Sequence, residues 1–138
     1  MSTRSKEKEE KILEILQYLA EESSKGTPII VEGKKDIKTL RALGVEGKII
    51  AAKTGGKAFL DIISDIEKTE AKEVILLLDF DRRGRELTMK LQQHLEMIGI
   101  RLNLTFWREL SGLLGTELKD VEGLASYMET LKSKTSNS

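Results

Sequence analysis

Apolar residues recur along this chain at two spacings, one typical of helices and one typical of strands. Between residues 5 and 24 they return every three to four positions with charges in between, which predicts an amphipathic surface helix. Short β-branched runs then alternate with helical spacing, and glycines separate them. The expected strands span 28–33, 48–52, 73–78 and 101–106, and the expected later helices span 36–43, 57–69, 83–97 and pieces of 107–132 broken at Gly112, Gly115 and Gly123.

The run at 73–78 is apolar without alternation, so both of its faces should be buried, as in a parallel sheet covered by helices. The run at 101–106 alternates and should be less buried. The pattern predicts an α/β fold: a small, doubly wound, Rossmann-like sheet of about four mainly parallel strands, with helices on both faces and an extra N-terminal helix. We expect a helix and linker over 1–27, one domain over 28–132, and a disordered polar tail over 133–138.

Composition narrows the class of protein. A chain of 138 residues is the size of one domain with one core. Its 23 basic and 23 acidic residues cancel, so any nucleic-acid site must be a local patch. Without cysteine there are no disulfides and no cysteine zinc site. The charged N-terminus and the lack of an apolar run of about 20 residues predict a cytoplasmic protein without a membrane partner.

Polar residues follow three of the expected strands, at 32–36, 53–57 and 79–82. In a doubly wound sheet the carboxyl ends of the strands form the functional edge, near the point where strand order reverses. Three segments that are distant in sequence therefore bring acids, lysines, glycines and arginines to one edge. This convergence predicts where the site lies.

Asp79 and Asp81 are two residues apart, so on an extended chain they project from the same face. Paired carboxylates suit a hard cation such as Mg²⁺, with Mn²⁺ as the alternative ion. Glu32 would face this pair if the first and third strands are neighbours, and it could then ligate the metal or transfer protons. The other interpretation is helix capping, which fits Asp81 equally well.

Positively charged side chains at the start of the helix after Asp81 are unfavourable, because the N-terminus of a helix itself carries partial positive charge. A bound phosphate would offset this repulsion. The lysines and glycines that follow the first two strands could extend such a phosphate site, although loop lysines are commonly just solvated. The candidate phosphate or nucleic-acid contacts are Lys34, Gly55, Gly56, Lys57, Arg82, Arg83 and Arg85.

Two motifs, IIVEGKKD (29–36) and ILLLDFDRRG (75–84), resemble the Toprim domain, the catalytic module of topoisomerases, bacterial primases and certain nucleases. The resemblance is greatest to the ribonuclease that matures 5S ribosomal RNA and to small stand-alone Toprim proteins. It includes the Thr-Gly-Gly loop at 54–56 and, more weakly, the segment 120–124, and it spans about 28–130.

The resemblance implies that Glu32 is the general acid/base and that Asp79 and Asp81 are magnesium ligands. It also implies that Asp36 belongs to the acidic cluster. Arg83 and Arg85 depart from the pattern, because type IA topoisomerases carry acids there.

The expected function is therefore Mg²⁺-dependent phosphoryl transfer on nucleic acid, with hydrolysis of RNA favoured over DNA. The alternative is a nucleic-acid-binding or adaptor module that keeps the metal site without turnover, and a small nucleotide phosphotransferase is a third reading. We see no zinc-binding region and no tyrosine-bearing domain, so neither primase nor topoisomerase activity is expected. A protein partner or a homodimer stays open.

Overall fold

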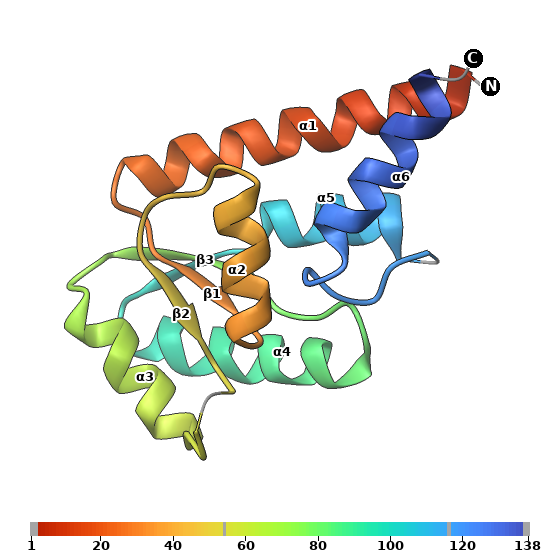
Figure 1. Cartoon of the computed structure of the whole chain (residues 1–138). Helices are drawn as coiled ribbons and strands as arrows, with labels where there is room; N and C mark the ends of the chain where they lie inside the picture. Colours follow the sequence, from red (N-terminus) through yellow and green to blue (C-terminus); the bar gives the residue numbers. More distant parts are fainter. Residues whose placement is uncertain (1–2, 54, 116, 137–138) are drawn as a thin grey trace.

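The structure, a computed structural model, describes residues 3–53, 55–115 and 117–136. Strands and helices alternate along it after a long first helix, as the apolar pattern predicts (Figure 1). The strands are β1 (Ile29–Val31), β2 (Ile49–Ala51), β3 (Glu73–Leu77) and β4 (Arg101–Asn103). The helices are α1 (Thr3–Ser24), α2 (Lys34–Ala42), α3 (Phe59–Lys68), α4 (Arg82–Met97), α5 (Thr105–Leu114) and α6 (Leu124–Ser136).

The strands form one parallel sheet in the order β2-β1-β3-β4. Strand β1 is central, since Ile29 is in register with Ile49 of β2 on one side and with Ile75 of β3 on the other. The chain moves outward from β1 to β2, then crosses to β3 on the far side of β1. Strand order therefore reverses at the β1–β3 pair, where a doubly wound sheet places its ligand crevice.

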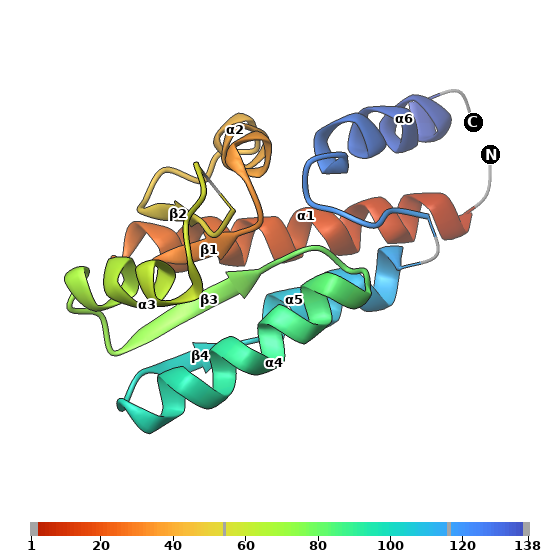
Figure 2. The same ribbon diagram turned by 90° about the horizontal axis from the view of Figure 1, so that it is seen from below.

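Helices cover both faces of the sheet (Figure 2). Successive strand side chains point to opposite faces, so Ile30 and Leu76 pack against α3 and α4, whereas Val31 and Leu77 face the other layer. That other layer consists of α1, α2, α5 and α6. This arrangement confirms the predicted α/β fold, with helices on both faces of four parallel strands.

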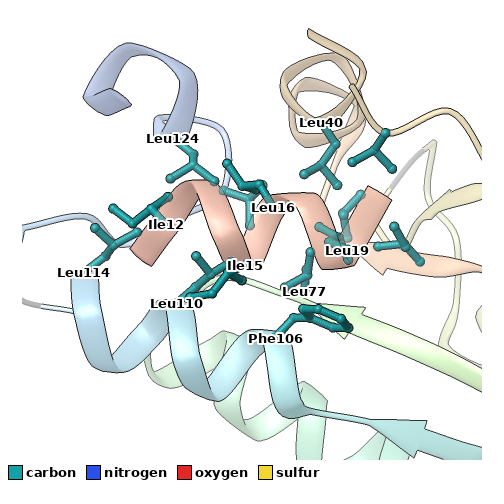
Figure 3. Packing of buried hydrophobic residues seen from close by; sticks show 14 of the residues in the cluster. Ile12, Ile15, Leu16, Leu19, Leu40, Leu77, Phe106, Leu110, Leu114 and Leu124 are labelled. Atoms are coloured by element: carbon teal, nitrogen blue, oxygen red, sulfur yellow. The ribbon is translucent and has the colours of Figure 1, made fainter. Parts of the chain in front are cut away.

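Helix α1 belongs to the same core as the sheet. Its apolar stripe of Ile12, Ile15, Leu16 and Leu19 is at most 5% exposed, and it packs in one cluster with the sheet, α5 and α6 (Figure 3). The amphipathic pattern thus predicts the helix correctly. Burying four large aliphatic side chains stabilises the fold by roughly 1.5–3 kcal/mol for each.

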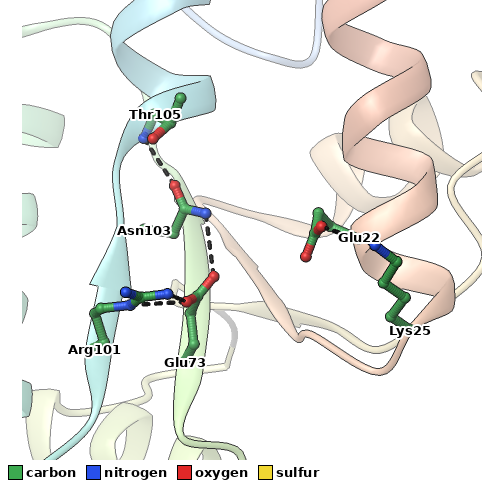
Figure 4. A network of polar contacts seen from close by, with 6 residues as sticks. All are labelled: Glu22, Lys25, Glu73, Arg101, Asn103 and Thr105. Atoms are coloured by element: carbon green, nitrogen blue, oxygen red, sulfur yellow. Dashed lines mark hydrogen bonds and ion pairs between the residues drawn. The ribbon is translucent and has the colours of Figure 1, made fainter.

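The last predicted strand ends earlier than its alternation suggests. Asn103 closes β4: its side-chain oxygen accepts the backbone N–H of Thr105 at 2.9 Å, and its amide donates to Glu73 at 3.2 Å (Figure 4). Arg101 forms an ion pair with the same Glu73. The chain then turns into α5, which satisfies the apolar spacing of 104–114 better than a strand does.

The C-terminal region is more regular than expected. Gly112 lies within α5 and does not break it, whereas Gly115 ends that helix. Helix α6 continues to Ser136, so residues 133–136 of the expected tail are helical, and 137–138 lie outside the described residues. Among the described residues, no helix is long and apolar enough to cross a membrane.

Candidate functional site

A cleft of about 450 Å³ opens at the carboxyl edge of the sheet. It lies where β1 and β3 end side by side, the position expected from the strand order. Segments from four parts of the chain line it: the turn into α2, the loop after β2, the end of β3 and the approach to α6. The lining residues are Glu32, Gly33, Lys34, Lys35, Asp36, Lys53, Gly55, Asp79, Asp120 and Glu122.

Glu32 directly follows β1 and is only 9% exposed. Its Oε2 is buried and has no hydrogen-bond partner among the described residues. Lys53, from the loop after β2, approaches this oxygen to 3.5 Å, an ion pair without hydrogen-bonding geometry. Burial raises the pKa of Glu32, and the charge of Lys53 opposes that rise. The carboxylate therefore keeps an unsatisfied oxygen inside the cleft.

Asp79 follows β3 and lies next to Glu32, because β1 and β3 are paired neighbours. Burial and then the charge of Glu32 raise the pKa of Asp79 to about 7, with smaller contributions from Asp36, Asp81 and Asp120. The negative charges of four carboxyl groups thus raise the pKa of Asp79. Repulsion of this kind is relieved when a cation binds or when a carboxylate is protonated. The cleft is built to attract positive charge.

A stability measurement can test this electrostatic repulsion between the carboxylates. The pKa of Asp79 is higher in the folded protein than in the unfolded chain, so the folded state binds more protons between about pH 4 and pH 7. Stability in EDTA should therefore fall as the pH rises through that window and level off above it. Asp79→Asn should reduce this slope, to which Glu32 and Asp36 also contribute through their raised pKa values, and should raise the free energy of unfolding at pH 8 by about 1–2 kcal/mol, after allowance for solvent screening.

Urea unfolding at pH 5 and pH 8 measures the effect. Glu109→Asn, on the exposed face of α5, controls for loss of a carboxylate elsewhere. An Asp79→Asn protein that is no more stable than wild type at pH 8 would contradict the repulsion.

Asp81 adopts the capping role. Its Oδ1 accepts the N–H of Gly84 at 2.8 Å and caps α4, and its side chain is not among those that line the cleft. It is still close enough for its charge to raise the pKa of Asp79 and of Glu32. Capping occupies one oxygen of Asp81, and Oδ2 is left for another partner.

The structure brings Asp36 into the cleft together with two acids that were not among the predicted site residues, Asp120 and Glu122. Asp36 is 5% exposed; its Oδ2 accepts the N–H of Gly33 at 2.9 Å, and its Oδ1 has no hydrogen bond with the described residues. Burial and Asp120 raise the pKa of Asp36, against the hydrogen bond from Gly33.

Backbone contacts hold the acidic segment 117–123 against the cleft. The N–H of Phe80 donates to the carbonyl oxygen of Lys119 at 2.6 Å, and the hydroxyl of Thr39 donates to that of Glu122 at 2.9 Å. Only the Asp-x-Glu-Gly pattern at 120–123 could have indicated this role from sequence.

Of the predicted phosphate contacts, the structure places only Lys34 and Gly55 in the cleft. Gly55 and Gly56 have φ of 55° and 72°, a left-handed turn that glycine adopts readily. Thr54 of the same loop lies outside the described residues. Lys57 turns away and pairs with Asp65 at 2.6 Å.

The three arginines lie on exposed positions at the start of α4, outside the cleft. Arg82 pairs with Glu86 one turn later at 3.0 Å. The guanidinium groups of Arg83 and Arg85 make no hydrogen bond or ion pair with the described part of the chain. The structure therefore leaves their predicted contact with phosphate open.

The comparison with known proteins agrees with this geometry. The family model for the Toprim domain matches residues 27–107, which include both strand-end motifs. The chain belongs to the Toprim family. This confirms the resemblance found in the sequence.

Several archaeal proteins are similar to this Toprim chain over most of their length. The UPF0292 protein MJ1624 of Methanocaldococcus jannaschii is 42% identical over 120 residues, 86% of this chain and 91% of that protein. A UPF0292 protein of Methanosarcina acetivorans is 39% identical over 127 residues, 91% of this chain and 85% of that one. Among solved structures, a putative protein from Aquifex aeolicus superposes with a TM-score of 0.65 and 27% identity, covering 79% of this chain and 94% of that one.

Toprim domains typically bind Mg²⁺, and membership of the family supports a metal-dependent function connected with nucleic acid. The donors in the cleft fit such an ion chemically, since they are carboxylate oxygens and two of them, on Glu32 and Asp36, are buried without a hydrogen bond. Within the described residues, however, no three acidic or histidine side chains are already arranged around a common point. Side-chain rotation would be needed to complete a coordination shell.

Proposed function

We propose that this Toprim protein is a Mg²⁺-dependent phosphoryl-transfer module that hydrolyses nucleic acid, with RNA preferred over DNA, in the cytoplasm. The observation that carries the proposal is the position of Glu32 and Asp79 just after two adjacent strands, with an unsatisfied buried oxygen on Glu32. The preference for RNA rests on the resemblance to the 5S ribosomal RNA ribonuclease. A homodimer or a protein partner is compatible with it.

In this proposal Asp79, Asp81 and Glu32 hold the metal, and Asp36 adds negative charge beside them. Bound Mg²⁺ would neutralise charge on the scissile phosphate and lower the pKa of water. Asp81 can take part through its second oxygen while the first continues to cap α4.

Glu32 then serves as the general base. Its carboxylate accepts a proton from the attacking water as the new P–O bond forms, and the bond to the leaving oxygen breaks. The same proton can return to that leaving oxygen, which restores the carboxylate. Burial raises the pKa of Glu32, which favours proton uptake by its carboxylate, and Lys34 and Lys53 line the same cleft, where they can contact phosphate.

The test is cleavage of labelled structured RNA, single-stranded RNA, single-stranded DNA and duplex DNA with Mg²⁺, with Mn²⁺ and with EDTA. We expect RNA products that require the metal and vanish in EDTA. Metal-enhanced binding without product on every substrate would instead support the adaptor function. The absence of both binding and product would overturn the nuclease function and the adaptor function.

A further inference from the structure

A second and larger cavity, of about 660 Å³, runs along β2, beside the acidic cleft. Strand β2 is at the edge of the sheet and, within the described residues, pairs only with β1. The cavity extends from Lys48, before β2, to Ala51 at its end, and Ile37 of α2 and Lys68 of α3 border it. We name it the β2 groove.

Positive charge dominates the β2 groove. Four lysines line it, Lys34, Lys48, Lys57 and Lys68, against a single described carboxylate, Asp65. Lys57 is neutralised by Asp65, with Nζ 2.6 Å from Oδ2, and it also donates to the carbonyl oxygen of Ala51. The other three lysines are exposed, and their ammonium groups make no hydrogen bond or ion pair with any residue that the structure describes.

The charges of three groove lysines, Lys57, Lys68 and Lys48, act on one carboxylate, Asp65. The pKa of Asp65 is lowered first by its hydrogen bond with Lys57, and Lys68 and Lys48 lower it further. Lys48 and Lys68, which form no ion pair within the described residues, therefore concentrate positive charge beside β2 in a protein whose formal net charge is zero. A local field of this kind attracts a polyanion to one surface without making the whole chain basic.

The β2 groove adjoins the cleft at Lys34. This residue begins α2, two positions after Glu32, and it lines both cavities. A chain of phosphates lying along β2 would therefore lead directly to the carboxylates. Lysine contacts of this type bind backbone phosphates and carry no sequence information.

We infer that the β2 groove binds the phosphate backbone of a single nucleic-acid strand and delivers it to the acidic cleft, an inference that rests on the proposed function. Three residues of strand rise about 10 Å, enough for a few nucleotides of one strand. No aromatic side chain is among the described residues that line the groove, so bases are not stacked there. Binding should thus depend on charge and not on sequence.

The experiment measures binding in EDTA, so that cleavage does not enter. Fluorescence anisotropy with a labelled 12-nucleotide oligouridine compares wild type with Lys48→Ala/Lys68→Ala between 50 and 200 mM salt. Each lysine–phosphate contact contributes about 0.7 to the logarithmic salt slope for a single strand, so the double variant should be less steep by about 1.4. Over this range wild type should lose about sevenfold more affinity than the variant.

Lys6→Ala/Lys11→Ala, which removes the same charge from the exposed face of α1, should bind like wild type. Melting temperatures of both variants verify the fold. Equal salt slopes for the groove variant and wild type would overturn the inference. So would equal lysine-dependent binding of a duplex or of polyglutamate, because the groove would then be a general anion site.

The two proposals fail separately. Lysine-dependent binding without cleavage under Mg²⁺ would leave the β2 groove in place and remove the nuclease function. Metal-dependent cleavage with unchanged binding by the groove variant would support the nuclease function and overturn the role of the β2 groove.

Discussion

Glu32→Gln should lower the rate of Mg²⁺-dependent cleavage by about 10²- to 10⁴-fold, the usual contribution of a positioned acid or base. Glutamine has nearly the same size, so the packing at the end of β1 should be kept. It cannot accept a proton, and it removes the charge that Lys53 faces at 3.5 Å. Single-turnover rates on the best RNA substrate measure the effect, and anisotropy in EDTA should show binding close to that of wild type.

Two further variants sharpen this prediction. Glu109→Gln, an exposed glutamate of α5, should cleave at the wild-type rate. Glu32→Asp keeps a carboxylate on a shorter side chain and should recover part of the activity, with a shifted pH profile. If Glu32→Gln cleaves within about threefold of wild type, Glu32 is not the base and the mechanism proposed above is wrong.

Gly84→Ala should lower the free energy of unfolding by about 3 kcal/mol, at the upper end of the usual cost of overpacking. A Cβ at this position would lie 2.0 Å from the carbonyl oxygen of Asp79 and 2.7 Å from its carbonyl carbon. Both are backbone atoms, so the start of α4 and the end of β3 would have to separate. The N–H of Gly84 that caps onto Asp81 would move with them.

Urea denaturation provides the measurement, and Gly112→Ala is the matched control. Gly112 also lies within a helix, but a Cβ there meets nothing within 4 Å. Its replacement should raise the stability by about 0.5–1 kcal/mol, because alanine favours a helix over glycine. If both variants are equally stable, the close approach at Asp79 does not constrain the protein.

The sequence predicts much of this fold because local patterns decide it. Strand 73–78 is apolar on both faces, and in the structure Val74 to Leu77 are fully buried between helices. Strand-end positions carry Glu32 and Asp79 to the same edge. Their proximity depends on β1 and β3 being neighbours, which the local pattern could not decide and the strand order shows.

Other features depend on contacts that no local pattern encodes. Lys57 forms an ion pair with Asp65, because α3 places that carboxylate beside the end of β2. β4 stops at Asn103, whose side chain is engaged by both Thr105 and Glu73. Asp120 reaches the cleft because the backbone of Phe80 binds the residue before it.

Segment 117–123 lines the cleft although it is far from Glu32 in the sequence, and this has a consequence for folding during synthesis. One wall of the cleft begins at Glu32 and another at Asp120, so contacts spanning nearly 90 residues must close before the carboxylates surround a common space. During synthesis the early strands leave the ribosome without this wall. A nascent chain can pair β1 with β2 but cannot enclose the cleft, so the acidic cleft should form only after synthesis has passed segment 117–123.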